Sequence, residues 1–143
     1  MAVRREGMKN LAVFTIRAAT GFMLFYFHGL DKLKGAYGHF AHGSEWQFPE
    51  MLSGVGLPLA TLLALYATFA EGIASLALGA GLWTRYAGAA ITASMLGAIY
   101  FHMKTSSRPE LAVLYGAIAL LFAFVDPGRF SIDALRSGRG SRR

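Results

Sequence analysis

The sequence predicts an all-α integral membrane protein, an up-down four-helix bundle whose two termini both lie in the cytoplasm. Hydrophobic residues make up 55% of its 143 residues and charged residues only 15%, whereas an ordinary soluble domain carries about 25% charged residues. The charges are confined to a few stretches, which leaves four long apolar segments between them. The uneven distribution of Lys and Arg over the connections then sets the orientation of the bundle.

The four segments form a single domain, residues 1–143, with helices expected at about 11–30, 57–82, 84–103 and 109–126. About 20 residues are needed to cross the hydrocarbon core, with roughly 17 as the short end. The first two segments exceed this length, and the last two reach it only with their flanking residues. A soluble four-helix bundle is disfavoured because segments 87–101 and 111–125 carry no charged residue on any face.

Two further signals divide the chain. Ser107, Pro109 and Glu110 have the spacing of a capping box with proline in the first turn, which predicts that the fourth helix begins there. The long connection 31–56 is rich in Gly, His and aromatic residues, and we expect it to be an interfacial loop with a short helix around 49–53.

The distribution of basic residues predicts the location of the protein. Nine of the 14 Lys and Arg residues lie on the side of the termini, four lie on the other side, and Arg17 lies within the first helix. The side with more Lys and Arg faces the cytoplasm, so the sequence predicts a multi-pass protein of the cell inner (plasma) membrane. The basic ends lie beside apolar segments and suit the lipid bilayer as partner, not nucleic acid.

Several kinds of chemistry are excluded by what the sequence lacks. It has no cysteine, which removes disulfides, thiolate nucleophiles and iron–sulfur ligation. It also has no P-loop, no GxGxxG pattern and no GxSxG elbow. We therefore expect a non-catalytic subunit and not an enzyme acting by itself.

Arg17 and Glu71 are the two charged residues that fall inside the first two apolar segments. An unpaired charge at the centre of a membrane helix costs at least about 2.5–3.5 kcal/mol on insertion scales, so we expect the two to form an intramembrane charge pair. Three hypotheses follow. The pair is a structural salt bridge, Glu71 titrates or holds a ligand, or Arg17 extends to the headgroups.

A second group of polar residues is expected near the outer membrane face. His28 and Lys32 follow the first apolar segment, and Tyr100 and His102 end the third on the same side. No HxxH or HExxH spacing supports a metal or haem site. A quinone headgroup needs only a donor, an acceptor and an aromatic wall, so these four residues form a possible ligand site. Ordinary interfacial polar residues without a ligand are the alternative.

The order and spacing of short motifs along nearly the whole chain resemble the DoxX family of small bacterial four-helix inner-membrane proteins. The resemblance is carried by the following residues: Arg17, Gly21, Phe25, His28-Gly29, Lys32-Leu33, Glu71-Gly72, Leu76, Gly79, Gly81-Leu82, Thr84-Arg85 and the closing stretch from Asp126 to Asp133. The family's charged positions map onto Arg17, Lys32, Glu71 and Arg85.

The resemblance implies a role in membrane redox work, since the family takes its name from a small subunit linked to quinol oxidation and thiosulfate:quinone oxidoreduction. We therefore expect an accessory subunit of a quinone-linked membrane oxidoreductase complex, with quinone as cofactor, with membrane redox proteins as partners and with the capacity to form a homo-oligomer. The cysteine pair of related four-helix proteins is absent, so thiol chemistry is not implied. Two alternatives stay open: a small transporter or permeability factor using Glu71, and a ligand-free membrane scaffold.

Overall fold

Every regular element of the computed structural model, which describes residues 2–138, is a helix. The all-α class predicted from the sequence is therefore confirmed for this part of the chain. The elements are α1 (Ala2–Leu24), the π-helix η1 (Phe25–Gly29), α2 (Leu30–His42), α3 (Gln47–Gly54), α4 (Ala60–Thr68), the π-helix η2 (Phe69–Ala74), α5 (Ser75–Ala80), α6 (Thr84–Lys104), α7 (Glu110–Phe124) and α8 (Ile132–Arg136).

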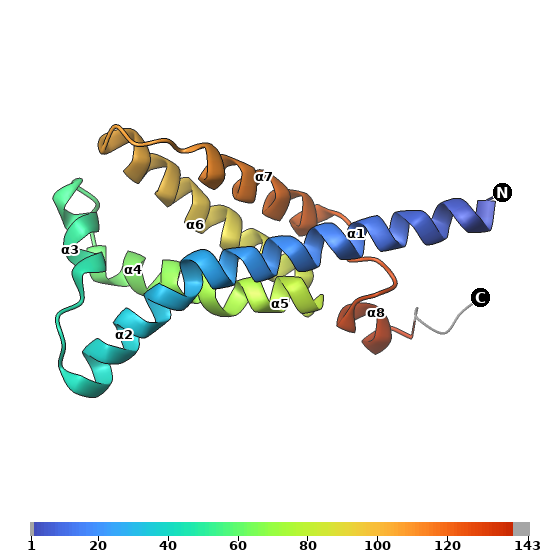
Figure 1. Cartoon of the computed structure of the whole chain (residues 1–143), viewed down its shortest axis with the longest axis horizontal. Helices are drawn as coiled ribbons and strands as arrows, with labels where there is room; N and C mark the ends of the chain where they lie inside the picture. Colours follow the sequence, from blue (N-terminus) through green and yellow to red (C-terminus); the bar gives the residue numbers. More distant parts are fainter. Residues whose placement is uncertain (1, 139–143) are drawn as a thin grey trace.

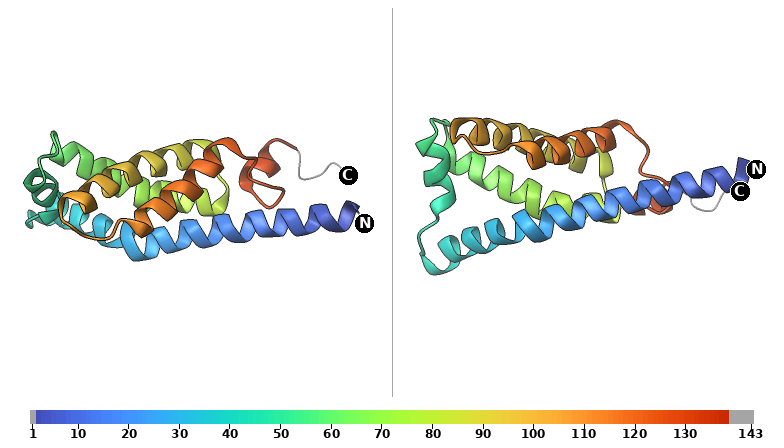
Figure 2. Two further views of the ribbon diagram at one scale, coloured as in Figure 1. Left: turned by 90° about the horizontal axis from the view of Figure 1, so that it is seen from above. Right: turned by 45° about the horizontal axis from the view of Figure 1, so that its top comes forward.

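The helices form long rods that run side by side. The elements α1, η1 and α2 make one continuous rod, and α4, η2 and α5 make a second. The second rod packs against the first rod and against α6, which forms a hairpin with α7, and α7 also contacts α1 (Figures 1 and 2). The short helix α8 lies near the N-terminal half of α1, and α3 lies at the opposite end of the molecule (Figure 1).

Two of these rods have the length and composition of membrane-crossing helices, Arg4–His42 and Ala60–Ala80. The surface supports a membrane environment, because large apolar side chains are exposed along all the long helices, among them Phe22, Leu62, Leu96 and Leu121. Soluble monomers rarely expose contiguous apolar patches larger than a few hundred Å². The apolar helix Glu110–Phe124 is shorter.

The first rod extends beyond its predicted end at Leu30 and continues to His42, so most of the expected loop 31–56 is helical. The sequence contains the reason. Leu33, Ala36, Tyr37 and Phe40 recur at the i, i+3, i+4, i+7 spacing of a helix face, and the helix ends only at Gly43, whose φ of 66° is in the left-handed region. The short helix expected around 49–53 lies within α3.

The predicted capping box of the fourth helix does not form. The residue preceding α7 is Pro109, and no side chain caps this helix end. Ser107 is instead drawn to the end of α6, where its hydroxyl lies 2.7 Å from His102 Nδ1 and 2.7 Å from Thr105 Oγ1. The fourth helix begins where it was predicted, since α7 starts at Glu110. The capping box itself was wrong, because His102 and Thr105 bind the serine hydroxyl instead.

The first two rods approach each other backbone to backbone. A Cβ atom added at Gly21 would lie 2.6 Å from the backbone nitrogen of Gly79, and one added at Gly29 would lie 2.8 Å from Cα of Gly72. Small residues at helix contacts permit this approach in a membrane, where apolar side chains gain little from leaving lipid. The glycine contacts set the register of the two rods, and they place Gly29 level with Glu71.

Candidate functional site

Glu71 lies in the π-helix η2, at the contact with the π-helix η1. A π-helical turn adds a residue to the helix and leaves carbonyl groups without their usual partners, and such turns are frequent at functional sites. Here the hydroxyl of Ser75 donates to the carbonyl oxygens of Glu71, at 2.5 Å, and of Gly72, at 2.8 Å. The Ser75 hydroxyl thereby supplies a hydrogen bond to the carbonyl groups of the irregular turn. The side chain of Glu71 takes no part in this and interacts with the surrounding helices.

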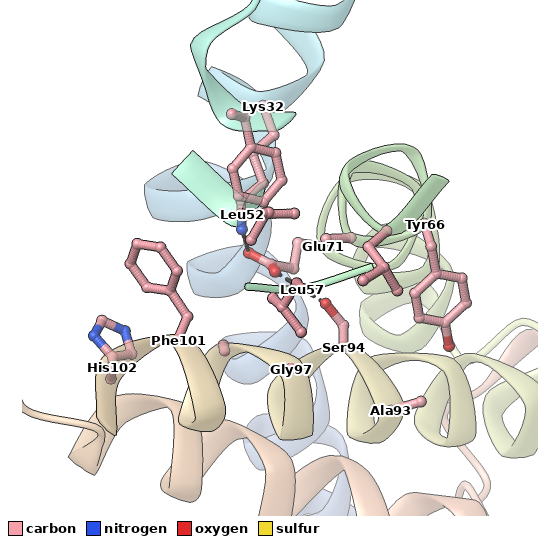
Figure 3. Close-up of a pocket in the computed structure, with 14 residues that line it drawn as sticks. Lys32, Leu52, Leu57, Tyr66, Glu71, Ala93, Ser94, Gly97, Phe101 and His102 are labelled. Atoms are coloured by element: carbon pink, nitrogen blue, oxygen red, sulfur yellow. Dashed lines mark hydrogen bonds and ion pairs between the residues drawn. The ribbon is translucent and has the colours of Figure 1, made fainter. Parts of the chain in front are cut away.

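The Glu71 carboxylate is almost completely buried and binds two side chains. Its Oε2 forms an ion pair with the ammonium group of Lys32, from α2, and its Oε1 accepts a hydrogen bond of 3.1 Å from the hydroxyl of Ser94, from α6. The Lys32 ammonium also lies 5.0 Å from the ring centre of Phe48 in α3. Residues from four helical segments therefore converge on one buried ion pair (Figure 3).

Arg17 and Glu71, the charge pair expected from the sequence, are not brought together. Arg17 is fully buried and donates to the carbonyl oxygens of Pro127, at 2.7 Å, and Phe130, at 2.6 Å. Glu71 lies level with Gly29, twelve residues beyond Arg17, which is about 18 Å along a helix. The predicted pair does not form because α1 continues well past the end of α5, and Arg17 therefore lies level with Gly81 and not with Glu71.

An apolar cavity of about 260 Å³ adjoins the ion pair. It lies between α4 and α6 and beneath α3, and Figure 3 shows Tyr66, Ala93 and Gly97 around it, with Lys32 and Glu71 at its polar end. Ser94 and His102 are the further polar residues of its wall, and its other lining residues are glycine, aliphatic or aromatic. Leu63 and Tyr66 of α4 are more than a third exposed, so the cavity opens on the outer surface of the molecule.

The predicted outer-face residues separate into two groups. His28, Lys32 and His102 line a second cavity of about 170 Å³ together with Glu71 and Tyr115. Tyr100 is not among its lining residues; its ring lies on the surface, 5.5 Å from the Lys104 ammonium. The structure thus brings three of the four residues to the Glu71 site and leaves Tyr100 outside it.

Sequence reasoning missed three polar residues at this site. Ser94 binds Glu71 directly, the Tyr115 ring meets His28 edge-on with ring centres 5.9 Å apart, and the Tyr66 hydroxyl donates to the carbonyl oxygen of Ala90 at 2.8 Å. Ser94 was detectable, because it is a hydroxyl within the apolar segment 87–101, which carries no charged residue. The roles of Tyr66 and Tyr115 depend on helix rotation, which the sequence pattern does not specify.

The arrangement offers donors and acceptors in an apolar setting. The Lys32 ammonium, the Ser94 hydroxyl and the histidine rings can hydrogen-bond a ligand, while the carboxylate of Glu71 can accept a hydrogen bond or a proton. In the described residues, no group of three or more His, Cys, Asp or Glu is placed to hold a metal ion.

A separate polar cluster closes the opposite end of the molecule. Asp133 accepts hydrogen bonds from the backbone amides of Trp83 and Thr84, each at 2.9 Å, and from the Thr84 hydroxyl at 2.8 Å. Burial by itself would raise the pKa of Asp133, but these hydrogen bonds and the charge of Arg136 lower it below its ordinary value. Asp133 thus caps α6 from a distance, and Arg17 holds the segment before α8 in place.

The family assignment rests on a comparison with models of known families. The DoxX model matches residues 12–104, which is more than half of the chain. The chain belongs to the DoxX family. Searches among curated proteins and among solved structures found no match.

The match covers the Lys32–Glu71 pair and the first cavity, whereas Tyr115 of the second cavity lies beyond it. Arg17, Lys32, Glu71 and Arg85, onto which the family's charged positions were mapped, all lie within residues 12–104. In this DoxX protein, Lys32 and Glu71 form the buried pair, Arg17 binds the 127–130 segment, and Arg85 lies at the exposed start of α6. The closing stretch from Asp126 to Asp133 lies beyond the matched residues.

Proposed function

We propose that this DoxX protein is an accessory subunit of a quinone-linked oxidoreductase complex in the cell inner membrane, and that it holds a quinone headgroup beside the Lys32–Glu71 pair. In this proposal four helical rods cross the membrane, with both termini in the cytoplasm and the Lys32–Glu71 pair in the outer half. The excess of Lys and Arg on the side of the termini supports this orientation.

The observation that carries the proposal is the buried ion pair at the end of an apolar cavity that opens on the molecular surface. Buried ion pairs contribute little net stability compared with apolar packing, and ionisable residues inside membrane segments are typically functional. Lys32 and Ser94 can donate hydrogen bonds to the carbonyl groups of a quinone, and Glu71 can accept a hydrogen bond from a hydroxyl group of the quinol.

The size of the cavity suits a headgroup better than a whole lipid. Its volume of about 260 Å³ is just below the roughly 300–1,000 Å³ of pockets that enclose drug-sized ligands. An isoprenoid tail would leave through the opening between α4 and α6, where Leu63 and Tyr66 are partly exposed. The apolar wall would bury the ring of the headgroup, since apolar area removed from water contributes about 25 cal/mol per Å².

A transporter that uses Glu71 is less well supported. Such a protein needs a path from the acidic residue to both sides of the membrane, and transporters usually interrupt their helices for it. On the side of the termini, the backbones of the first two rods meet at Gly21 and Gly79. Thr20, Ser75 and Leu78 are all buried in the same region.

A short-chain quinone tests the proposal. Replacing Trp83 by Phe leaves Trp46, which lies in the same core cluster as Leu52 of the cavity wall, as the only tryptophan. Titration of this variant in nanodiscs with decylubiquinone should quench Trp46 fluorescence saturably. Lys32→Met should weaken binding about tenfold or more, because one charged donor, contributing about 1.5–3 kcal/mol, is lost.

Lys104→Met is the matched control, since Lys104 is an exposed lysine at the same end of the molecule and lies outside the cavity. It should leave the quenching curve unchanged. Quenching that never saturates, or that is the same in all three proteins, would mean that the quinone only partitions into the bilayer, and the proposed function would be wrong.

A further inference from the structure

The second cavity differs from the first in its lining. The two cavities share Lys32, Glu71, Ala98 and His102. The first is otherwise bounded by α3, α4 and α6, whereas the second is bounded by α1, η1, α6, α7 and the turn before α7. The ion pair therefore lies between two separate spaces, and His102 borders both.

The second cavity connects the ion pair with the exposed turn between α6 and α7. Its inner part is lined by the buried Tyr115 and its outer part by Arg108 and Leu111, both of which are exposed. The His102 ring, on its border, is bonded to Ser107 of the same turn. Polar groups therefore follow one another from the buried carboxylate to water at the end of the molecule that is away from α8.

Titratable groups face Glu71 from several helical segments. Lys32 comes from α2, His28 from η1, His102 from α6, and Tyr115 from α7, with Arg108 on the turn before it. The Tyr66 hydroxyl, on α4, is bonded to the backbone of α6. Imidazole is the side chain that exchanges protons most readily near neutral pH, and both histidines line the second cavity.

We propose that the second cavity is a proton path between Glu71 and the aqueous phase at the outer face, while the first cavity admits the ligand from the bilayer. This inference rests on the proposed function of the site. These residues carry the proton alone: while the oxidoreductase complex of the proposed function takes the electrons of the quinol, a proton leaves the quinol hydroxyl for the Glu71 carboxylate, displaces Lys32 from it, and passes by His28 or His102 to water. No electron moves through these residues.

Carbodiimides test this assignment, because they modify carboxyl groups only in the protonated form. The lipid-soluble dicyclohexylcarbodiimide can reach Glu71 from the bilayer, and mass spectrometry of peptides measures the modification. In sealed vesicles of one orientation, raising the outer pH from about 6 to about 8 should slow the modification of Glu71 by about tenfold or more, since fewer protons reach the carboxylate. Changing only the inner pH should alter the rate less than about twofold.

Two exposed leucines provide matched variants, one at the mouth of each cavity. Leu111→Trp narrows the second cavity and should reduce the dependence on outer pH, while native mass spectrometry still detects bound decylubiquinone. Leu63→Trp narrows the first cavity and should slow both the carbodiimide and the quinone, while the pH dependence is retained. Both leucines are partly exposed, so neither substitution disturbs a buried core position.

The outcomes separate this inference from the proposed function. A rate that follows the inner pH, or that keeps its full dependence on outer pH in Leu111→Trp, would overturn the proton path even if quinone binds. Failure of the wild type to bind quinone would overturn the proposed function, and the sidedness of the pH effect would still decide whether the path exists.

Discussion

At the scale of single residues, the molecule places its charges where a second group can neutralise or bind them. Glu71 has Lys32 and Ser94, Arg17 has two backbone carbonyls, and Asp133 has three donors at the start of α6. Only the first of these lies beside cavities with an apolar wall. Arg17 and Asp133, with their partners, hold the segment 126–136 against the helices.

The ion pair predicts a coupling between its two members. Lys32→Met leaves a buried carboxylate without its partner and should lower the free energy of unfolding by about 3–5 kcal/mol. Glu71→Gln should lower the free energy of unfolding by less, because the Lys32 side chain is 21% exposed and can turn toward water. The double variant should be more stable than Lys32→Met alone. Thermal unfolding in detergent measures all three, with Lys104→Met as control, and equal stability of Lys32→Met and the control would contradict the pairing.

Asp133 predicts a pH dependence of stability. Its pKa is lower in the folded protein than in the unfolded chain, where it is about 3.9. The stabilisation is therefore fully present above about pH 4 and is lost as the pH falls through the lowered folded pKa.

The Asp133→Asn variant should have a free energy of unfolding about 0.5–2 kcal/mol lower at neutral pH, as when a helix cap is removed. Its stability should also depend less on pH in acid than that of the wild type. Thermal melting between pH 7 and about pH 3, with the exposed Glu50→Gln as control, measures this. A profile of Asp133→Asn parallel to that of the wild type would contradict the cap.

At the scale of the helices, the register between the first two rods determines the site. Gly29 touches the backbone of η2 and places Lys32, three residues later on the same rod, beside Glu71. A sequence pattern can identify these helices but not their relative shift along the axis. The charged positions could therefore be identified from the sequence. The partner assigned to Glu71 was wrong, because the pairing depends on the relative shift of the helices.

Substitution of glycines tests the register. Gly29→Ala would place a Cβ within 2.8 Å of Gly72 Cα, which should separate the rods and lower stability by about 1–3 kcal/mol or more. Gly97→Ala is the matched control, because nothing lies within 4 Å of its added Cβ. It should be neutral or stabilise α6 by about 0.5–1 kcal/mol. Comparable losses of stability in the two variants, measured by thermal unfolding, would argue against the close contact of the two rods at Gly29.

The helical class and the apolar rods could be predicted because hydrophobic composition and segment length depend only on the local sequence. The continuation of the first helix through His42 was also present in the pattern of Leu33, Ala36, Tyr37 and Phe40, although the Gly and His content of the segment suggested a loop. The π-helices and the long-range cap by Asp133 could not be predicted, since both depend on contacts between distant segments.

At the scale of the whole molecule, the polar clusters lie at different levels along the helices. The Arg17 and Asp133 contacts lie toward the end that carries α8, and the Lys32–Glu71 pair lies toward the end that carries α3. Between them the contact of the first two rods is formed by glycines and small residues. In the proposed orientation, one end anchors the protein at the cytoplasmic face and the other contains the ligand site.

The orientation can be tested directly because the chain has no cysteine. Single cysteines at Ser44 and Ser106 should react with a membrane-impermeant maleimide added to intact cells. Cysteines at Gly7 and Ser137 should react only after the membrane is opened. Labelling of all four positions from outside, or of Gly7 and Ser137 alone, would contradict the proposed topology of four spans with cytoplasmic termini.

Native mass spectrometry of the protein extracted gently with its lipids measures whether the Lys32–Glu71 site holds a membrane-soluble ligand. We predict that the wild type retains a quinone and that Lys32→Met loses it, while Lys104→Met retains it. A wild-type protein that carries only ordinary phospholipids, with the same spectrum in both variants, would contradict this prediction and leave the chain as a ligand-free structural subunit.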